Sequence, residues 1–286
     1  MDLLKSVYVS IYMVLAVIVA MGAGGQLIAT RSVLSWGGVL LAYVPFLAVL
    51  AWITVLHSTP RTSARFPIII VLAVVGVLAS TWGYIDGGSL AAALLAAGGL
   101  IAFLIYDYWY SSFGDRSNNS LVAGQSLPEF KLKNTAGEIV SSALLTDKPC
   151  VWIFYRGNWC PLCMAQVKEI AARYNEIEKL GVRVALVSPQ PHKYTQNLAK
   201  KFDVNFDFLT DEANKAARQL GIAHAFGVPM GMQALGYDSE TVMPTVIITD
   251  RGGRVLWLDE TDNYRVRPDP ETYLGVLQPG GYEKGA

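Results

Sequence analysis

The stretch Arg156-Gly157-Asn158-Trp159-Cys160-Pro161-Leu162-Cys163 decides which fold the sequence predicts. It contains two of the three cysteines, follows an apolar run at 151–155 and precedes a helix-like stretch at 165–180. A strand, a tight turn and a Cys-x-x-Cys at the start of a helix is typical of reversible dithiol–disulfide chemistry. The unpaired N–H groups and partial positive charge of a helix N-terminus stabilise a thiolate, which is the nucleophile. Two intervening residues place the second sulfur where it can attack a mixed disulfide formed by the first.

Charge is distributed unevenly along the 286 residues. The chain has 23 basic and 23 acidic residues and a formal net charge of +0, yet only seven of these charged residues precede position 111. An apolar half is therefore joined to an ordinary soluble half. The neutral balance, without a basic stretch that carries interleaved aromatics, argues against nucleic acid as a partner.

The apolar half predicts four membrane-spanning helices, at 7–28, 33–56, 67–85 and 89–106. Each run is close to the ~20 residues that cross a hydrocarbon core of ~30 Å, and none contains an internal Lys, Arg, Asp or Glu. Aromatic residues, which favour the depth of the membrane interface, gather near the proposed ends. A buried soluble bundle is the alternative, and four long uncharged runs in succession argue against it.

Basic residues predict the orientation of these spans, because short loops on the cytoplasmic side carry an excess of Lys and Arg. Four spans would put the N-terminus, the second loop and the soluble half on one side. That side has Lys5, Arg61, Arg65 and Arg116, whereas the opposite side has Arg31 alone. We therefore expect a multi-pass protein of the inner cell membrane with a cytoplasmic soluble domain.

The fourth span is rich in alanine and glycine over residues 91–99. Small side chains let helices approach closely in lipid, so this segment predicts either internal packing or a homodimer interface. No cysteine precedes position 150, and the spans therefore cannot pass electrons through thiols of their own. Two roles stay open for them: anchoring in the lipid bilayer, or binding a lipid-soluble partner.

The soluble half follows the expected membrane domain (1–110) and a polar linker (111–120), and we assign it residues 121–286. Strands are expected near 130 and 139 and at 150–155, 182–187, 206–209, 245–248 and 254–258, and helices at 165–180, 193–202, 214–220 and 269–277. Strands that alternate with helices, followed by a hairpin and a last helix, predict a mixed sheet flanked by helices. The expected fold is thus an α-helical membrane bundle of four transmembrane helices followed by an α/β thioredoxin-like fold.

Four segments of the soluble half match a known family: Phe154 to Cys163, Val187-Ser188-Pro189-Gln190, Met243-Pro244-Thr245 and Asp250-Arg251-Gly252-Gly253. In these segments the chain resembles the peroxiredoxin-like branch of the alkyl hydroperoxide reductase/thiol-specific antioxidant family, within the thioredoxin superfamily. The resemblance implies that Cys160 attacks, that Cys163 resolves and that Trp159 flanks the dithiol. It also implies that Met243 and Pro244, joined by a cis peptide bond, shape the substrate surface.

The segment before Cys160 departs from both parent families. Peroxiredoxins proper place Thr or Ser three residues before the attacking cysteine and Pro seven before, where this chain has Gly157 and Ile153. Thioredoxin proper has a buried Asp six residues before its first cysteine, where this chain has Phe154. Arg156 is then the nearest charge that could stabilise a thiolate, and a solvated turn residue is the alternative interpretation.

Other candidate residues give weaker signals. Cys150 is expected to be a small apolar core residue, with a second resolving role as the alternative. A zinc site is disfavoured because only Cys160 and Cys163 stand at ligand spacing. The two arginines at 263–268 are expected to be solvated. No glycine-rich phosphate loop follows a strand, so no nucleotide or metal cofactor is expected.

These features favour a membrane-anchored thiol–disulfide oxidoreductase. Cys160 would attack a disulfide in a partner protein, Cys163 would resolve the mixed disulfide, and an external thiol reductant would restore the dithiol. The alternative is a thiol-dependent hydroperoxide reductase, in which a small peroxide converts Cys160 to a sulfenic acid that Cys163 condenses with. A third hypothesis is a redox-inactive module that localises a partner at the membrane.

Overall fold

A computed structural model of the chain describes residues 2–56, 59–114, 116 and 121–278. The chain forms two compact units. Unit 1 comprises residues 1–6, 57–62 and 113–286, and unit 2 comprises residues 7–56 and 63–112. Unit 1 therefore includes two short segments from the apolar half of the sequence. Half of the predicted linker, residues 115 and 117–120, lies outside the described residues, and the predicted domain boundaries stay a prediction.

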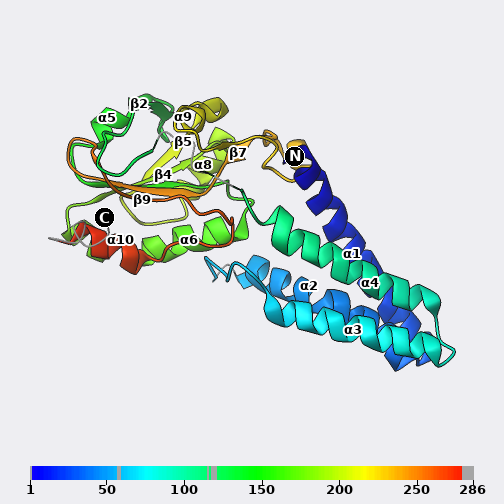
Figure 1. Cartoon of the computed structure of the whole chain (residues 1–286). Coiled ribbons are helices and arrows are strands. Elements are labelled where there is room, and N and C mark those ends of the chain that lie inside the picture. The colour runs from blue at the N-terminus through cyan, green and yellow to red at the C-terminus, as the bar shows by residue number, and fades with distance from the viewer. Residues whose placement is uncertain (1, 57–58, 115, 117–120, 279–286) are drawn as a thin grey trace. The chain divides into compact units, whose positions relative to one another are not determined.

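Unit 2 consists of long apolar helices, of which α2, α3 and α4 run side by side (Figure 1). The helices are α1 (Asp2–Thr30), the π-helical turn η1 (Val33–Gly37), α2 (Gly38–Leu56), α3 (Pro67–Ile85), α4 (Leu90–Leu104) and the π-helical turn η2 (Ile105–Tyr110). Four stretches in the described part of the chain are long and apolar enough to cross a membrane: Asp2–Thr30, Val33–Val55, Pro67–Ile85 and Leu90–Tyr110. The four predicted apolar helices are confirmed.

Large apolar side chains of these helices face outward. Met21, Val55 and Ile68 are 73%, 74% and 74% exposed. Each candidate span buries at most 33% of its most apolar 18-residue window. Water would make such a continuous apolar surface prone to association, whereas lipid would not. Unit 2 is thus compatible with a membrane environment.

Small residues of α4 pack inside unit 2. Ala92 and Ala96 are buried, and a Cβ placed on Gly99 would lie 2.6 Å from the Tyr43 ring. These contacts confirm internal packing as one use of the predicted small-residue segment. Its use as a homodimer interface stays a prediction.

Unit 1 is built around a seven-stranded sheet of strand order β2-β1-β5-β4-β3-β8-β9. The strands are β1 (Lys131–Lys133), β2 (Ile139–Ser141), β3 (Cys150–Phe154), β4 (Arg183–Ser188), β5 (Asp207–Thr210), β8 (Thr245–Thr249) and β9 (Val255–Asp259). β3 pairs parallel with β4 and antiparallel with β8, and its five residues are buried. A second, two-stranded sheet pairs β6 (Ala223–His224) with β7 (Thr241–Val242).

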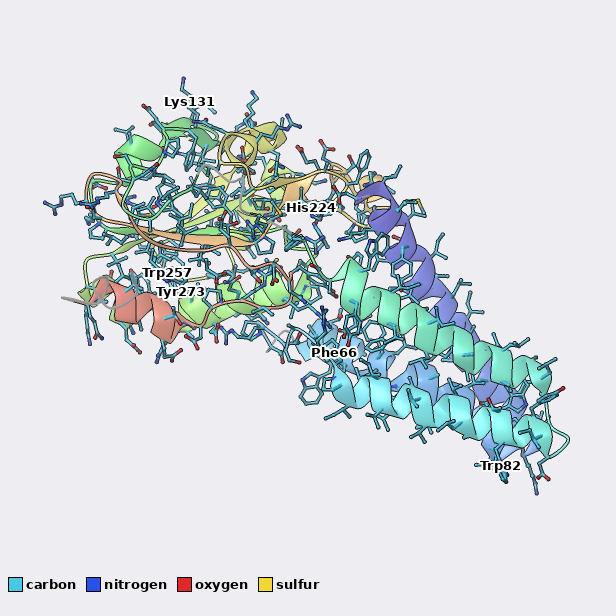
Figure 2. All side chains as sticks on the ribbon, viewed as in Figure 1. Phe66, Trp82, Lys131, His224, Trp257 and Tyr273 are labelled. Atoms are coloured by element: carbon cyan, nitrogen blue, oxygen red, sulfur yellow. The ribbon has the colours of Figure 1, made fainter. Side chains whose placement is uncertain are left out.

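Helices cover both faces of the larger sheet. They are α5 (Ser142–Leu145), α6 (Pro161–Ala172), α7 (Tyr174–Lys179), α8 (His192–Ala199), α9 (Lys215–Gln219) and α10 (Pro270–Leu277), with 3-10 turns η3 (Glu212–Asn214) and η4 (Met232–Leu235). α6 and α10 lie together on one face (Figure 1). Figure 2 shows Trp257 of β9 next to Tyr273 of α10, with ring centroids 6.5 Å apart. On the other face, Ala217 of α9 joins a core cluster with Trp152 and Phe154.

The predicted thioredoxin-like order of strands and helices is confirmed, with one difference near the dithiol. The helix expected at 165–180 begins earlier, at Pro161, and is divided into α6 and α7. The division falls at Arg173, whose φ of −97° and ψ of 11° are not helical. The dithiol therefore occupies the start of a helix of 12 residues.

Candidate active site

The dithiol follows the carboxyl end of the central strand β3. Cys160 is the N-cap residue of α6, with φ −91° and ψ 110°, and Pro161 takes the first helical position. Proline suits that position because its fixed φ is helical and the missing N–H has no partner there anyway. Cys163 therefore lies in the first turn of the same helix. The two residues are only 3% and 0% exposed.

Local geometry explains why Gly157 and Ile153 stand where peroxiredoxins proper have Thr or Ser and Pro. Gly157 has φ +141°, and a Cβ there would lie 2.7 Å from Nε1 of Trp159. Any side chain at this position would be strained and would displace the indole. Ile153 lies inside β3 and pairs with both neighbouring strands, a place where proline would remove a ladder hydrogen bond.

Arg156 is a buried part of the site. It is 4% exposed, and its guanidinium donates a hydrogen bond to the Gly227 carbonyl. The same guanidinium lies over the Trp159 ring at 4.8 Å and over the Tyr264 ring at 5.3 Å. The interpretation of Arg156 as a solvated turn residue is therefore wrong.

Arg267 contacts the dithiol directly. One of its terminal nitrogens, Nη2, donates to Cys163 Sγ at 3.4 Å, and the other donates to Gln166 Oε1 at 2.8 Å. Arg265 and Arg267 are 2% and 4% exposed, so the expectation that both are solvated is wrong. The Gln166 side chain of α6 also donates to the Tyr273 hydroxyl of α10 at 3.0 Å, so Gln166 links the Arg267 segment and α10 to α6.

Three donors converge on Cys163 Sγ: the Cys160 thiol, the Arg267 guanidinium and the main-chain N–H of Arg156. Burial acts to raise the pKa of Cys163, but these donors and the two arginine charges lower it to about 5. The hydrogen bond to Cys163, together with burial and the negative charge of that neighbour, raises the pKa of Cys160. The two arginine charges thus favour a thiolate within the Cys160–Cys163 pair.

Gln190 supports the turn that carries Trp159. It is 2% exposed, and its Oε1 accepts the main-chain N–H of Asn158 at 2.8 Å. Its amide nitrogen donates to the Tyr155 hydroxyl at 3.2 Å, and Tyr237 donates to the Asn158 side chain. The segment that ends in Gln190 is one of those that carry the family resemblance. The role of Gln190 in holding the turn was not predicted.

Met243 and Pro244 directly precede β8, whose first residue, Thr245, pairs with Phe154 at the end of β3. Pro244 and Arg267 line the same narrow crevice, together with Phe154. The peptide bond before Pro244 is trans, so the predicted cis bond is wrong. A trans proline is well accommodated just before a strand, where no ladder hydrogen bond is required of it. The Pro244 carbonyl accepts a hydrogen bond from Arg116 at 3.3 Å.

Cys150 lies at the opposite end of β3 from the dithiol. It is 0% exposed and belongs to the core cluster of Trp152 and Phe154. Burial, with the nearby Asp207 carboxylate, raises its pKa well above the usual value. It is therefore an apolar core residue, as predicted. Among the described residues, no group of three His, Cys, Asp or Glu side chains could hold a metal ion.

Known proteins resemble part of unit 1 in sequence. The sequence profile of the AhpC/TSA family matches residues 123–258. The chloroplastic peroxiredoxin Q of Populus jackii is 31% identical over 124 residues, which are 43% of this chain and 58% of that protein. The putative peroxiredoxin bcp of Helicobacter pylori (strain ATCC 700392 / 26695) is 32% identical over 134 residues, 46% of this chain and 84% of that protein. This chain belongs to the AhpC/TSA family.

The AhpC/TSA match includes the dithiol, Gln190 and Pro244 but ends at residue 258, before Arg267. It also excludes the four apolar helices. The chain spans 58% of the length of the Populus jackii relative. The family therefore accounts for the fold of unit 1, whereas Arg267 is a feature that only the structure brings to the site.

Proposed function

We propose that this chain is a membrane-anchored, thiol-dependent hydroperoxide reductase of the peroxiredoxin type. Cys160 attacks the terminal oxygen of a hydroperoxide and becomes a sulfenic acid, and Cys163 condenses with it to give an internal disulfide. A separate thiol reductant then restores the dithiol. The relatives named peroxiredoxin support peroxide as the substrate class.

One observation carries the proposal: Cys160 and Cys163 lie at the N-cap and in the first turn of α6, beside the buried Arg156 and Arg267. A thiolate is the form that reacts with peroxide, and positive charge stabilises it. The neighbouring thiol is already in place to resolve a sulfenic acid without movement of a separate chain segment.

Stopped-flow measurements on the reduced full-length protein in detergent test this function. We expect hydrogen peroxide to oxidise it rapidly, with formation of one disulfide between Cys160 and Cys163 that peptide mapping identifies. Slow oxidation, together with rapid reduction of insulin disulfides, would overturn the proposal.

A thiol–disulfide oxidoreductase is the second candidate. Gly157 and Ile153 stand where peroxiredoxins proper have residues that hold the peroxide, and this absence favours a disulfide substrate. The insulin assay above discriminates between the two candidates.

We further propose that unit 1 lies on the cytoplasmic side of the membrane, on the strength of the basic residues at 5, 61, 65 and 116. In a chain without native cysteines, the exposed Lys131 (Figure 2) and the exposed Asp86 can each be replaced by cysteine. We expect a membrane-impermeant maleimide to label Lys131→Cys only in inverted vesicles and Asp86→Cys only in right-side-out vesicles. The opposite pattern would reverse the orientation.

A further inference from the structure

We propose that Arg61 is a positioning residue of the redox centre, which holds Arg267 against Cys163 and thereby speeds formation of the Cys160–Cys163 disulfide. This inference rests on the proposed function and deepens it. Arg61 comes from the chain between α2 and α3, which the AhpC/TSA match does not include. The resolving step therefore depends on a side chain from the apolar half of the sequence.

Arg61 bridges two elements that meet at Cys163. Its terminal nitrogens form an ion pair with Glu169 of α6, the helix that carries Cys163, with an Nη1–Oε1 distance of 3.1 Å. Its Nε donates to the Arg267 carbonyl at 3.0 Å, and its Nη2 donates to the Pro268 carbonyl at 3.2 Å. All of these residues belong to unit 1. One guanidinium thus fastens the segment at 265–268 to the dithiol helix.

The segment at 265–268 depends on such contacts for its position. Residues 266–269 are described and form neither helix nor strand. Thr62, next to Arg61, adds a main-chain hydrogen bond to the Arg265 carbonyl at 3.0 Å. Fixing an irregular segment costs conformational entropy, which contacts of this kind must offset. Removal of the Arg61 side chain should therefore loosen Arg267 before it affects the sheet.

Arg267 acts on the resolving sulfur directly. Its Nη2 lies 3.4 Å from Cys163 Sγ, and its Nη1 donates to Gln166 Oε1 at 2.8 Å. A guanidinium is permanently charged, and a positive charge at this distance favours the thiolate of the sulfur. The side chain is buried, so water screens this attraction little. The thiolate is the form that attacks, and the position of Arg267 therefore sets how much reactive Cys163 exists at a given pH.

The resolving step balances with these groups. The Cys163 thiolate attacks the sulfur of the Cys160 sulfenic acid, so that the S–S bond forms as the S–O bond breaks. Hydroxide leaves and takes a proton from water. No further electron acceptor is needed, because the peroxide has already taken two electrons from Cys160 and the disulfide shares that oxidation between two sulfurs. Arg267 stays charged throughout.

The test is the pH dependence of disulfide formation in the full-length protein in detergent. Reduced protein is mixed with hydrogen peroxide and quenched in acid at intervals, and the Cys160–Cys163 disulfide is measured by peptide mass. The peroxide concentration is raised until the rate no longer depends on it, so that the rate reports the resolving step alone. The rate against pH then gives the midpoint at which half of Cys163 is a thiolate.

We expect Arg61→Met to raise this midpoint by at least about half a pH unit, a roughly threefold fall in the acid dissociation constant of Cys163, because Arg267 moves away from the sulfur. Arg61→Lys should give a smaller shift in the same direction, since one ammonium cannot reach Glu169 and two carbonyls together. A wild-type midpoint in either variant, in a protein that retains its wild-type circular dichroism, overturns the inference and leaves the proposed function intact.

The double variant Arg61→Met/Arg267→Met tests whether Arg61 acts through Arg267. We expect Arg267→Met alone to raise the midpoint by about one pH unit or more, because it removes the charge beside the sulfur. The double variant should show the same midpoint as Arg267→Met, since the two side chains belong to one network. A shift equal to the sum of the two single shifts would overturn the route through Arg267.

Arg173→Met is the matched control. The Arg173 side chain is 33% exposed, against 30% for Arg61, and it forms an ion pair that joins the end of α6 to Glu271 of α10. We expect its midpoint to match the wild type. An upward shift as large as that of Arg61→Met would show that the loss of any such ion pair moves the midpoint, which overturns the specific role of Arg61. A wild-type protein that forms no disulfide with peroxide would instead overturn the proposed function.

Discussion

The two ends of β3 place cysteines in equally buried but chemically opposite surroundings. Cys150 at the start of the strand and Cys163 beyond its end are both 0% exposed. Burial and the Asp207 carboxylate raise the pKa of Cys150, whereas three donors and two arginines lower that of Cys163 despite its burial. Burial alone therefore does not set the pKa of a thiol in this protein. The donors that face the sulfur set it.

The largest expected effect is a difference in activity between cysteine variants at the two ends of β3. We expect Cys160→Ala to lower peroxide consumption by at least about a thousandfold, because it removes the attacking sulfur. Cys150→Ala should leave the rate within about twofold and cost about 1 kcal/mol in free energy of unfolding, through a small cavity. Peroxide consumption and denaturant unfolding of the two variants provide the measurements. Equal loss of activity in both variants would contradict the comparison.

The next effect concerns pH. The folded-state pKa of Cys163, about 5, lies below the ~8.5 of an unfolded cysteine. Between these values the unfolded chain binds the extra proton, so the reduced protein should gain up to about 1.4 kcal/mol of stability per pH unit as pH rises. This gain in stability is complete above the pKa of the unfolded cysteine and is lost as the pH falls through about 5.

The disulfide form is the control for this pH effect, because it has no dithiol to ionise. We expect the thermal-unfolding midpoint of the reduced protein to rise relative to that of the oxidised protein from pH 5 to pH 8. A constant difference between the two midpoints would show that the dithiol carries no buried charge.

The smallest effect concerns the turn that joins β3 to the dithiol. Gly157→Ala should cost about 1–3 kcal/mol in free energy of unfolding from backbone strain, and it should displace Trp159, which lies within 2.7 Å of the added Cβ. Gly181→Ala is the matched control, because Gly181 has φ +66° but nothing within 4 Å. Tryptophan fluorescence should change only in Gly157→Ala, and an equal change in both would exclude a specific contact with Trp159.

The fold was largely predictable from the sequence, because its signals are local. The apolar runs and the alternation of strands with helices depend on neighbouring residues, and both predictions are confirmed. The dithiol was also located, because Cys160 and Cys163 lie within one helical turn. Their assigned roles remain proposals.

The electrostatics of the site was not predictable, because it depends on contacts distant in sequence. Arg267 lies 104 residues after Cys163, in a segment whose turn-forming composition indicated a solvated tail. Arg156 was ambiguous because burial cannot be read from one turn residue. The cis bond at Pro244 was expected from its place in the element order, but that order does not determine the isomer.

The assembly of unit 1 from separated segments has a consequence for the order of synthesis. Arg61 contacts the Arg267 carbonyl across 206 residues, and the Ser6 hydroxyl contacts the Val228 carbonyl across 222. A ribosome completes residues 6 and 61 long before their partners exist. Unit 1 can therefore close only when nearly the whole chain has emerged, long after the helices of unit 2 have been synthesised. A fragment that begins at residue 121 would lack both segments and should fold less completely than the full chain.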